Sequence, residues 1–278
     1  MNKPKFVIGI GSQRAGSTLL HRILDECTDI FMHPVKELHY FDTLYNVRHQ
    51  DVLTKYSKAQ LDREFERLIS SKEHGYISNK KYKCFLRTNK LLHENKVEDI
   101  DYKDLFRPCL MGNKMIGEIT PEYMILPEEG INRMAEIVGN DAAIILITRD
   151  PVERFISAFK LLKVYGKENV DMSNFSEEIL SVFDELPTWV EQQRLLSNYE
   201  AAYDNYSSVF DNVTTISYND LVNNASSVCS KLESALDTKV NRDRYISMLG
   251  RKVNQIGETG KLSEAALSKL KDALIVNR

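Results

Sequence analysis

The sequence predicts a single α/β domain, 1–278, in which helices flank a central parallel sheet of the P-loop type. Two observations lead to this prediction. Short apolar runs alternate with longer stretches of helical periodicity, and the first apolar run leads into a glycine-containing loop and then a helix. No repeat, and no linker rich in proline and glycine, divides the 278 residues. A globule of this size buries roughly 70–75% of its unfolded surface, so it needs no disulfide or metal for stability.

The individual elements follow from local sequence patterns. Short apolar runs, often β-branched and bounded by glycine or polar residues, are typical of buried parallel strands. The expected strands are 6–10, 114–118, 142–147 and 213–217. Helices are expected where apolar residues recur at helical spacing, and at Asp150-Pro151, where Asp is a good N-cap and Pro a good first helical residue. The expected helices begin near Gly16 and at Pro151, and lie near 225–236 and 263–276.

Composition excludes several classes of protein. The chain has 37 Lys and Arg against 40 Asp and Glu, a net charge of −3, which excludes a basic protein that coats nucleic acid. No apolar run approaches the ~18 residues that a membrane span requires, and the N-terminus does not resemble a signal peptide. The 4 cysteines are far apart, with no pair at metal-ligand spacing. We expect a cytoplasmic protein with free thiols.

Residues 11–18 (GSQRAGST) follow the first strand with the spacing of a Walker phosphate loop. Such a loop curls so that several N–H groups and a helix N-terminus face one phosphate. A nucleoside triphosphatase carries lysine just before the final Ser or Thr, but Ser17 stands there, and the only cation of the loop is Arg14. No acidic residue ends a clean apolar strand as a magnesium partner would. We therefore expect a phosphorylated ligand bound without a triphosphate–magnesium centre.

A second candidate site combines Arg149 and Ser157. Arg149 follows the strand 142–147, at the sheet edge where α/β proteins bind ligands, and Ser157 lies two turns into the next helix. A guanidinium fork and a hydroxyl suit a second phosphate. The structural alternative is that Asp150 and Arg154 form a surface ion pair and that Ser157 is a small packing residue.

A third candidate site is 36–42 (KELHYFD). If this segment is extended, the Glu37 carboxylate and the His39 imidazole point the same way, and either group can take a proton from an attacking hydroxyl. The structural alternative is a half-buried edge strand with a solvated lysine and glutamate.

Taken in this order, the segments resemble the sulfotransferase family that uses 3′-phosphoadenosine 5′-phosphosulfate (PAPS), and within it the carbohydrate branch that includes heparan sulfate sulfotransferases. Four blocks carry the likeness: the 5′-phosphosulfate loop at 13–20, the catalytic glutamate segment at 36–42, a Glu-Lys-Thr-Pro-x-Tyr block at 118–123, and the 3′-phosphate motif at 149–154 with Ser157. A weaker stretch, 251–263, falls where the family has a nucleotide-covering loop. The likeness spans most of the chain outside 50–110.

The resemblance implies transfer of a sulfuryl group from PAPS to an acceptor hydroxyl on a glycan or glycoconjugate, with adenosine 3′,5′-bisphosphate as product and no metal. Glu37 would be the general base, His39 the alternative base, and Arg14 would stabilise charge on the bridging oxygen. The donor-binding residues would be Arg14, Ala15, Gly16, Ser17, Thr18, Leu19, Arg149, Ser157, Arg251 and Lys252. Residues 50–110, rich in charge and tyrosine, are expected to be a mostly helical insertion near the acceptor site.

Departures from the family pattern leave alternatives open. The family lysine of the Glu-Lys-Thr-Pro block is Ile119 here, and Lys36 is a candidate to replace it. A net charge of −3 does not favour heparan sulfate as acceptor, and sulfation of protein tyrosines would use the same chemistry. The other candidates are an atypical P-loop kinase, which would need magnesium, and a catalytically silent nucleotide-binding protein.

Overall fold

The computed structural model describes residues 4–70, 79–107, 109–110, 112–171, 173–249 and 262–274. These residues build one five-stranded sheet in the order β2-β3-β1-β4-β5, with every pairing parallel. The strands are β1 (Lys5–Ile10), β2 (Phe31–Met32), β3 (Met115–Thr120), β4 (Ala143–Thr148) and β5 (Asn212–Ser217). The predicted α/β class and four predicted strands are confirmed. The two-residue strand β2 was not predicted, because two residues carry no periodicity.

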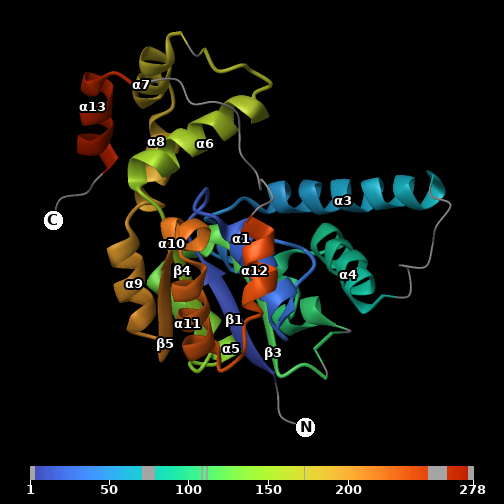
Figure 1. Cartoon of the computed structure of the whole chain (residues 1–278). Helices are drawn as coiled ribbons and strands as arrows, with labels where there is room; N and C mark the ends of the chain where they lie inside the picture. Colours follow the sequence, from blue (N-terminus) through green and yellow to red (C-terminus); the bar gives the residue numbers. More distant parts are fainter. Residues whose placement is uncertain are drawn as a thin grey trace.

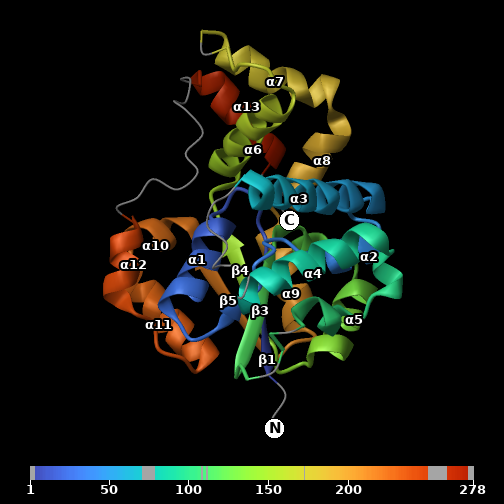
Figure 2. The ribbon, with the colours of Figure 1, turned by 90° about the vertical axis from the view of Figure 1, so that its right-hand side faces the viewer.

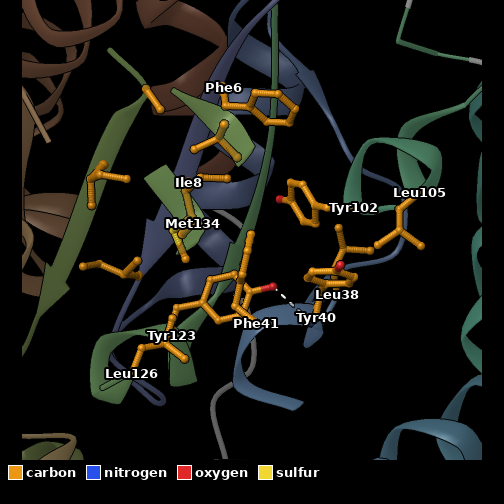
Figure 3. Close-up of a cluster of buried hydrophobic side chains, with 14 of the residues drawn as sticks. Phe6, Ile8, Leu38, Tyr40, Phe41, Tyr102, Leu105, Tyr123, Leu126 and Met134 are labelled. Atoms are coloured by element: carbon orange, nitrogen blue, oxygen red, sulfur yellow. Dashed lines mark hydrogen bonds between the residues drawn. The ribbon is translucent and has the colours of Figure 1, made fainter. Parts of the chain in front are cut away.

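Two groups of helices cover the two faces of the sheet (Figure 2). One face carries α1 (Ser17–Cys27), α10 (Tyr218–Asn223), α11 (Ala225–Leu236) and α12 (Arg242–Leu249). The other face carries α2 (Tyr40–Leu44), α4 (Lys80–Glu94), α5 (Glu128–Val138) and α9 (Tyr199–Ser207). Each face buries its own apolar cluster, and Figure 3 shows the cluster under α2 and α5, where the rings of Phe41, Tyr102 and Tyr123 meet. This double layer is what an all-parallel sheet requires, since both of its faces must be covered.

A third group of helices packs beyond the carboxyl ends of the strands (Figure 1). It comprises α6 (Pro151–Tyr165), α7 (Phe175–Glu185), α8 (Pro187–Leu195) and α13 (Glu264–Leu274), which share a separate small apolar cluster. Asp150 is the N-cap of α6, and its side chain accepts a 2.9 Å hydrogen bond from the Glu153 N–H, as predicted. None of the helices formed by the described residues is both long enough and apolar enough to span a membrane.

Within 50–110, the described residues form α3 (Gln50–Ser70), α4, and 3-10 turns at Val97–Asp99 and Tyr102–Phe106. Helix α3 runs beside α4 and below α6 (Figures 1 and 2), and its only buried residues are Leu53 and Ser57. The other residues of α3 are half-buried or exposed.

The strand order sets the place of the site. Strands β1 and β4 are neighbours, and the connection after β1 runs to β2 on one side of the sheet while the connection after β4 runs to β5 on the other, so the two diverge at the carboxyl ends. The register puts Ile10 opposite Thr120, and Thr148 opposite Ser217, so these strands end at one edge. Parallel sheets bind ligands at such a switch point.

Candidate functional site

The loop after β1 joins that strand to the N-terminus of α1, and hydrogen bonds hold it on the neighbouring elements. Its backbone is anchored at both sides, because the Gly11 N–H donates to the Pro121 carbonyl (3.0 Å) and the Ser12 N–H donates to the Ile147 carbonyl (2.8 Å). The Ser12 hydroxyl donates to the Leu196 carbonyl at 2.6 Å. The first N–H groups of α1 have no partner within the helix, so they remain available at this loop for an anion.

Two glycines of the loop cannot be replaced by a residue with a side chain without strain. Gly11 and Gly16 have φ of +48° and +95°, a region that residues with a side chain enter with strain. A Cβ on Gly11 would lie 2.5 Å from the Met124 sulfur, and one on Gly16 would lie 2.9 Å from the Tyr218 ring. The loop therefore packs directly on the neighbouring elements, and its curvature is built into the fold.

The loop contacts the second candidate phosphate site directly. Arg14 Nε donates a hydrogen bond to Ser157 Oγ at 2.9 Å, and Arg149 Nη1 donates to the Arg14 carbonyl at 3.0 Å. Burial, and then the positive charge of Arg149, lower the pKa of Arg14. Two guanidinium groups held this close favour the binding of anionic groups between or beside them.

Tyr218 is a site residue that the sequence analysis missed. The Arg149 guanidinium lies 4.5 Å from the centre of the Tyr218 ring, which places an aromatic face under the cation. Tyr218 follows β5 at the same sheet edge, and Ser217 caps the helix that it opens. The end of the predicted strand 213–217 was the available signal, since side chains there face the same edge as Arg149.

Arg154 does not lie at the site surface. It is completely buried, and its guanidinium donates to Ser197 Oγ (3.0 Å), Gln193 Oε1 (2.9 Å) and the Gln193 carbonyl (2.6 Å). Burial lowers its pKa to about 10. The surface ion pair with Asp150, considered above, is therefore wrong. Its hydrogen bonds instead connect α6 with Gln193 of α8 and with Ser197, which follows α8.

The segment 36–42 is not extended, and neither the extended conformation nor the edge strand considered above is correct. Glu37 and His39 have φ of +67° and +50°, in the left-handed region. This irregular backbone still brings the two side chains together, with His39 Nε2 3.6 Å from Glu37 Oε2. Lys36 Nζ donates to Glu37 Oε1. The Glu37 carboxylate and the His39 imidazole therefore lie close together, as predicted, although the backbone between them is not extended.

The charges of this cluster fix the protonation of both groups. His39 Nδ1 contacts Asp42 Oδ2 at 2.7 Å and lies 4.0 Å from Glu122 Oε2. Burial lowers the pKa of His39, but the charge and hydrogen bond of Asp42 and the bond to Glu37 outweigh it and raise that pKa to about 10. Burial raises the pKa of Glu37, and the bond from His39 and the charge of Lys36 outweigh it, so the pKa falls well below its usual value. At neutral pH Glu37 is a carboxylate and His39 an imidazolium.

Glu122 and Arg48 complete the cluster, and sequence reasoning assigned neither. Arg48 Nη2 donates to Glu122 Oε1 at 3.2 Å, and its Nε lies 3.4 Å from Asp42 Oδ2. Among the described residues, ligand atoms of Glu37, His39 and Glu122 lie within 4.8 Å of one another, a spacing compatible with a metal ion. A metal ion there would have to displace the proton of His39, since only a neutral imidazole binds a metal.

The remaining predicted site residues are placed as follows. Ala15, Ser17 and Leu19 are buried, so Ala15 and Leu19 offer a ligand only their backbone, and Thr18 is half-buried at the start of α1. Ile119, where the family has lysine, is fully buried in the core. Arg251 and Lys252 lie outside the described residues.

Comparisons with known proteins agree with this fold. A crystal structure of a sulfotransferase from Alicyclobacillus acidocaldarius matches with a TM-score of 0.54 and 18% identity, over 98% of this chain and 91% of that one. A structure of retinol dehydratase in complex with androsterone and inactive cofactor PAP has a TM-score of 0.41 and 15% identity, over 99% of this chain and 65% of that one. No curated protein matches the chain. The profile of the Sulfotransferase family matches residues 4–242, most of the chain, and the protein therefore belongs to the sulfotransferase family.

Proposed function

We propose that this sulfotransferase moves a sulfuryl group from PAPS to an acceptor hydroxyl on a saccharide, with Glu37 as the general base. The direct contact between Arg14 and Ser157 carries the proposal, because it joins the phosphate loop to the second anion site. A donor with phosphates at both its 5′ and 3′ positions needs two such sites on one sheet edge. ATP and GTP lack a 3′-phosphate and would leave the second site empty.

The donor would lie along the ends of β1, β4 and β5. The loop 11–16 and the first turn of α1 would hold the 5′-phosphosulfate, with Ser17 and Thr18 supplying hydroxyls. Arg149 and Ser157 would hold the 3′-phosphate. Arg14, between the two, is placed to stabilise the negative charge that develops on the bridging oxygen as the S–O bond breaks.

The protonation of the cluster supports Glu37 as the base. Its carboxylate can accept the proton of the acceptor hydroxyl while that oxygen attacks sulfur and the phosphate oxygen leaves. His39 carries its proton at neutral pH, so it cannot take another, and it serves instead as the hydrogen-bond donor that orients Glu37. In-line alignment of the three reacting atoms, rather than a strong base, would supply most of the rate.

The proposed acceptor site lies beside α3 and the end of α6. Tyr56 and Tyr165 are 49% and 74% exposed. Burial raises the pKa of Tyr56, and the charge of the Glu37 carboxylate raises it further. Exposed aromatic faces suit a sugar ring, whose C–H face is apolar and whose rim carries hydroxyls.

Ligand-induced thermal stabilisation tests the donor. Adenosine 3′,5′-bisphosphate at about 100 times its Kd should add about 2.7 kcal/mol of stability to the wild type, and R149A should lose most of this gain. Stabilisation by ADP with magnesium alone would instead indicate a kinase.

A transfer assay with PAPS tests the base. E37Q should bind the bisphosphate normally and lose turnover, whereas bisphosphate binding with no transfer to any hydroxyl acceptor, by wild type or E37Q, would indicate a silent binding protein.

A further inference from the structure

Glu118, in β3, is a fully buried carboxylate whose oxygens each receive two hydrogen bonds. Oε1 accepts from the hydroxyls of Tyr102 (3.0 Å) and Tyr123 (2.8 Å). Oε2 accepts from the Thr120 hydroxyl (2.7 Å) and from the Leu38 N–H (3.3 Å). The role that we propose for Glu37 does not use this group, although burying a carboxylate without a positive partner is expensive.

The network around Glu118 reaches three consecutive backbone N–H groups of the segment 36–42. The Leu38 N–H donates to Glu118 itself. The His39 N–H donates to the Thr120 hydroxyl at 3.4 Å, and the Tyr40 N–H donates to the Tyr123 hydroxyl at 3.1 Å (Figure 3). Both hydroxyls use their own hydrogen on Glu118, so the carboxylate orients them as acceptors.

These three N–H groups belong to the part of the chain with unfavourable backbone geometry. Glu37 and His39, on either side of Leu38, are both left-handed, and non-glycine residues remain there only when their surroundings hold them. Residues 36–39 precede α2, which begins at Tyr40, so the hydrogen bonds within that helix do not hold them. The Glu118 network supplies it from β3.

We propose that Glu118 is a positioning residue, which holds the 36–40 backbone so that the Glu37 carboxylate meets the acceptor hydroxyl. This inference rests on the proposed role of Glu37 as base. The three hydroxyls and the Leu38 N–H around Glu118 can all donate to it, and an ionised carboxylate accepts all four hydrogen bonds. A glutamine there would point its NH₂ group at two of these donors, so the network cannot survive the substitution even though the side-chain shape does.

The test compares E118Q and T120V with the control T88V. Thr120 and Thr88 are both fully buried, and each hydroxyl donates one 2.7 Å hydrogen bond, but the Thr88 bond goes to the Leu105 carbonyl, away from Glu37. We expect kcat to fall about 100-fold in E118Q and about 10-fold in T120V, because small misplacement of a reacting group has effects of this size. The Kd of adenosine 3′,5′-bisphosphate should stay within about 2-fold of wild type, since the donor contacts lie on other loops.

The control separates positioning from loss of stability. T88V should lower the melting temperature about as much as T120V and leave kcat unchanged. Wild-type kcat in T120V, or an equal loss of kcat in T88V, would overturn the positioning role, and T120V keeps this test available if E118Q does not fold. The proposed function fails separately, if E37Q retains wild-type kcat. An inactive E37Q with fully active E118Q and T120V would overturn this inference alone.

Discussion

Arg14 Nε lies 2.9 Å from Ser157 Oγ, across 143 residues of sequence. This bond joins the loop after β1 to the middle of α6, so the two predicted anion sites are one continuous structure. The hydrogen bond from Arg149 to the Arg14 carbonyl is a second link between the loop and the residue that precedes α6 by two positions. Removing any one of these three side chains should therefore disturb the binding of both ends of the donor.

The first prediction concerns Tyr218, which lies under the Arg149 guanidinium. Tyr218→Leu removes the aromatic face and leaves the cation free to move, a loss of about 0.5–2 kcal/mol. The Kd of adenosine 3′,5′-bisphosphate, measured by calorimetry, should rise about 2- to 30-fold. Tyr203→Leu is a matched control, since Tyr203 is 42% exposed on α9 and belongs to no site described here. Equal affinities of Y218L and Y203L would contradict the assignment.

Arg154 should matter for stability rather than for donor contact. Arg154→Ala removes three hydrogen bonds of a buried guanidinium and leaves Gln193 and Ser197 without it. The free energy of unfolding in urea should fall by at least about 1.5–3 kcal/mol, the range for a hydrogen bond to a charged group. Arg149→Ala should show the opposite pattern, with near-normal stability and weak binding. A fully stable R154A that fails to bind the bisphosphate would refute this division.

The charge of His39 should make stability depend on pH in the alkaline range. Its pKa is about 10 in the folded protein and about 6.5 in an unfolded chain. Because the folded pKa is the higher one, the stabilisation is complete below about pH 6.5 and disappears as the pH rises through 10. The melting temperature of the wild type should fall more between pH 7 and 10.5 than that of His39→Gln. Parallel curves for the two proteins would show that His39 is not held as an imidazolium.

Tyr56 should affect the acceptor but not the donor. Tyr56→Ala removes an exposed ring of the proposed acceptor site, so the KM for a saccharide acceptor should rise about 10-fold, with the KM for PAPS unchanged. Phe65→Ala is the matched control, because Phe65 is 63% exposed further along the same helix. If Y56A and F65A give the same acceptor KM, the acceptor does not contact this part of α3.

Lys36 is the candidate replacement for the cation that Ile119 does not provide. Lys36→Ala removes a partner of Glu37 and a positive charge beside the proposed base. We expect kcat to fall about 10-fold or more. Lys58→Ala, which breaks a surface pair with Asp62 on α3, should have no effect. Unchanged turnover in K36A would remove Lys36 from the mechanism.

Local patterns were enough to predict most of the fold. Strand 142–147 and the Asp150-Pro151 helix start depend on burial and capping, which are encoded within a few neighbouring residues. Strand β2 was not predicted, because its two residues form a strand only by pairing with β3, which is a long-range contact.

The site was predictable only in part, for the same reason. The residue types at 14, 37, 149 and 157 are visible in the sequence. The contacts of Arg14, Arg149 and Ser157 are not, because their bonds join segments that the fold brings together from far apart, whereas Glu37 contacts its sequence neighbours Lys36 and His39. The burial of Arg154 and the left-handed backbone at Glu37 and His39 also depend on partners elsewhere in the chain, namely Gln193 and the Glu118 network.

The position of β1 in the sheet bears on how the acceptor specificity of the enzyme can change while its donor site stays the same. Segments on the β3 side of β1 carry the proposed base Glu37, the Glu118 network and Tyr56 of α3, while segments on the β4 side carry Arg149, Ser157 and Tyr218. The residues proposed for the acceptor reaction therefore lie within 28–125, apart from Tyr165, and those proposed for the donor lie on either side, within 11–18 and 149–218. A chimera that exchanges 28–125 with a relative, and keeps the remainder, is the natural way to change the acceptor without rebuilding the donor site.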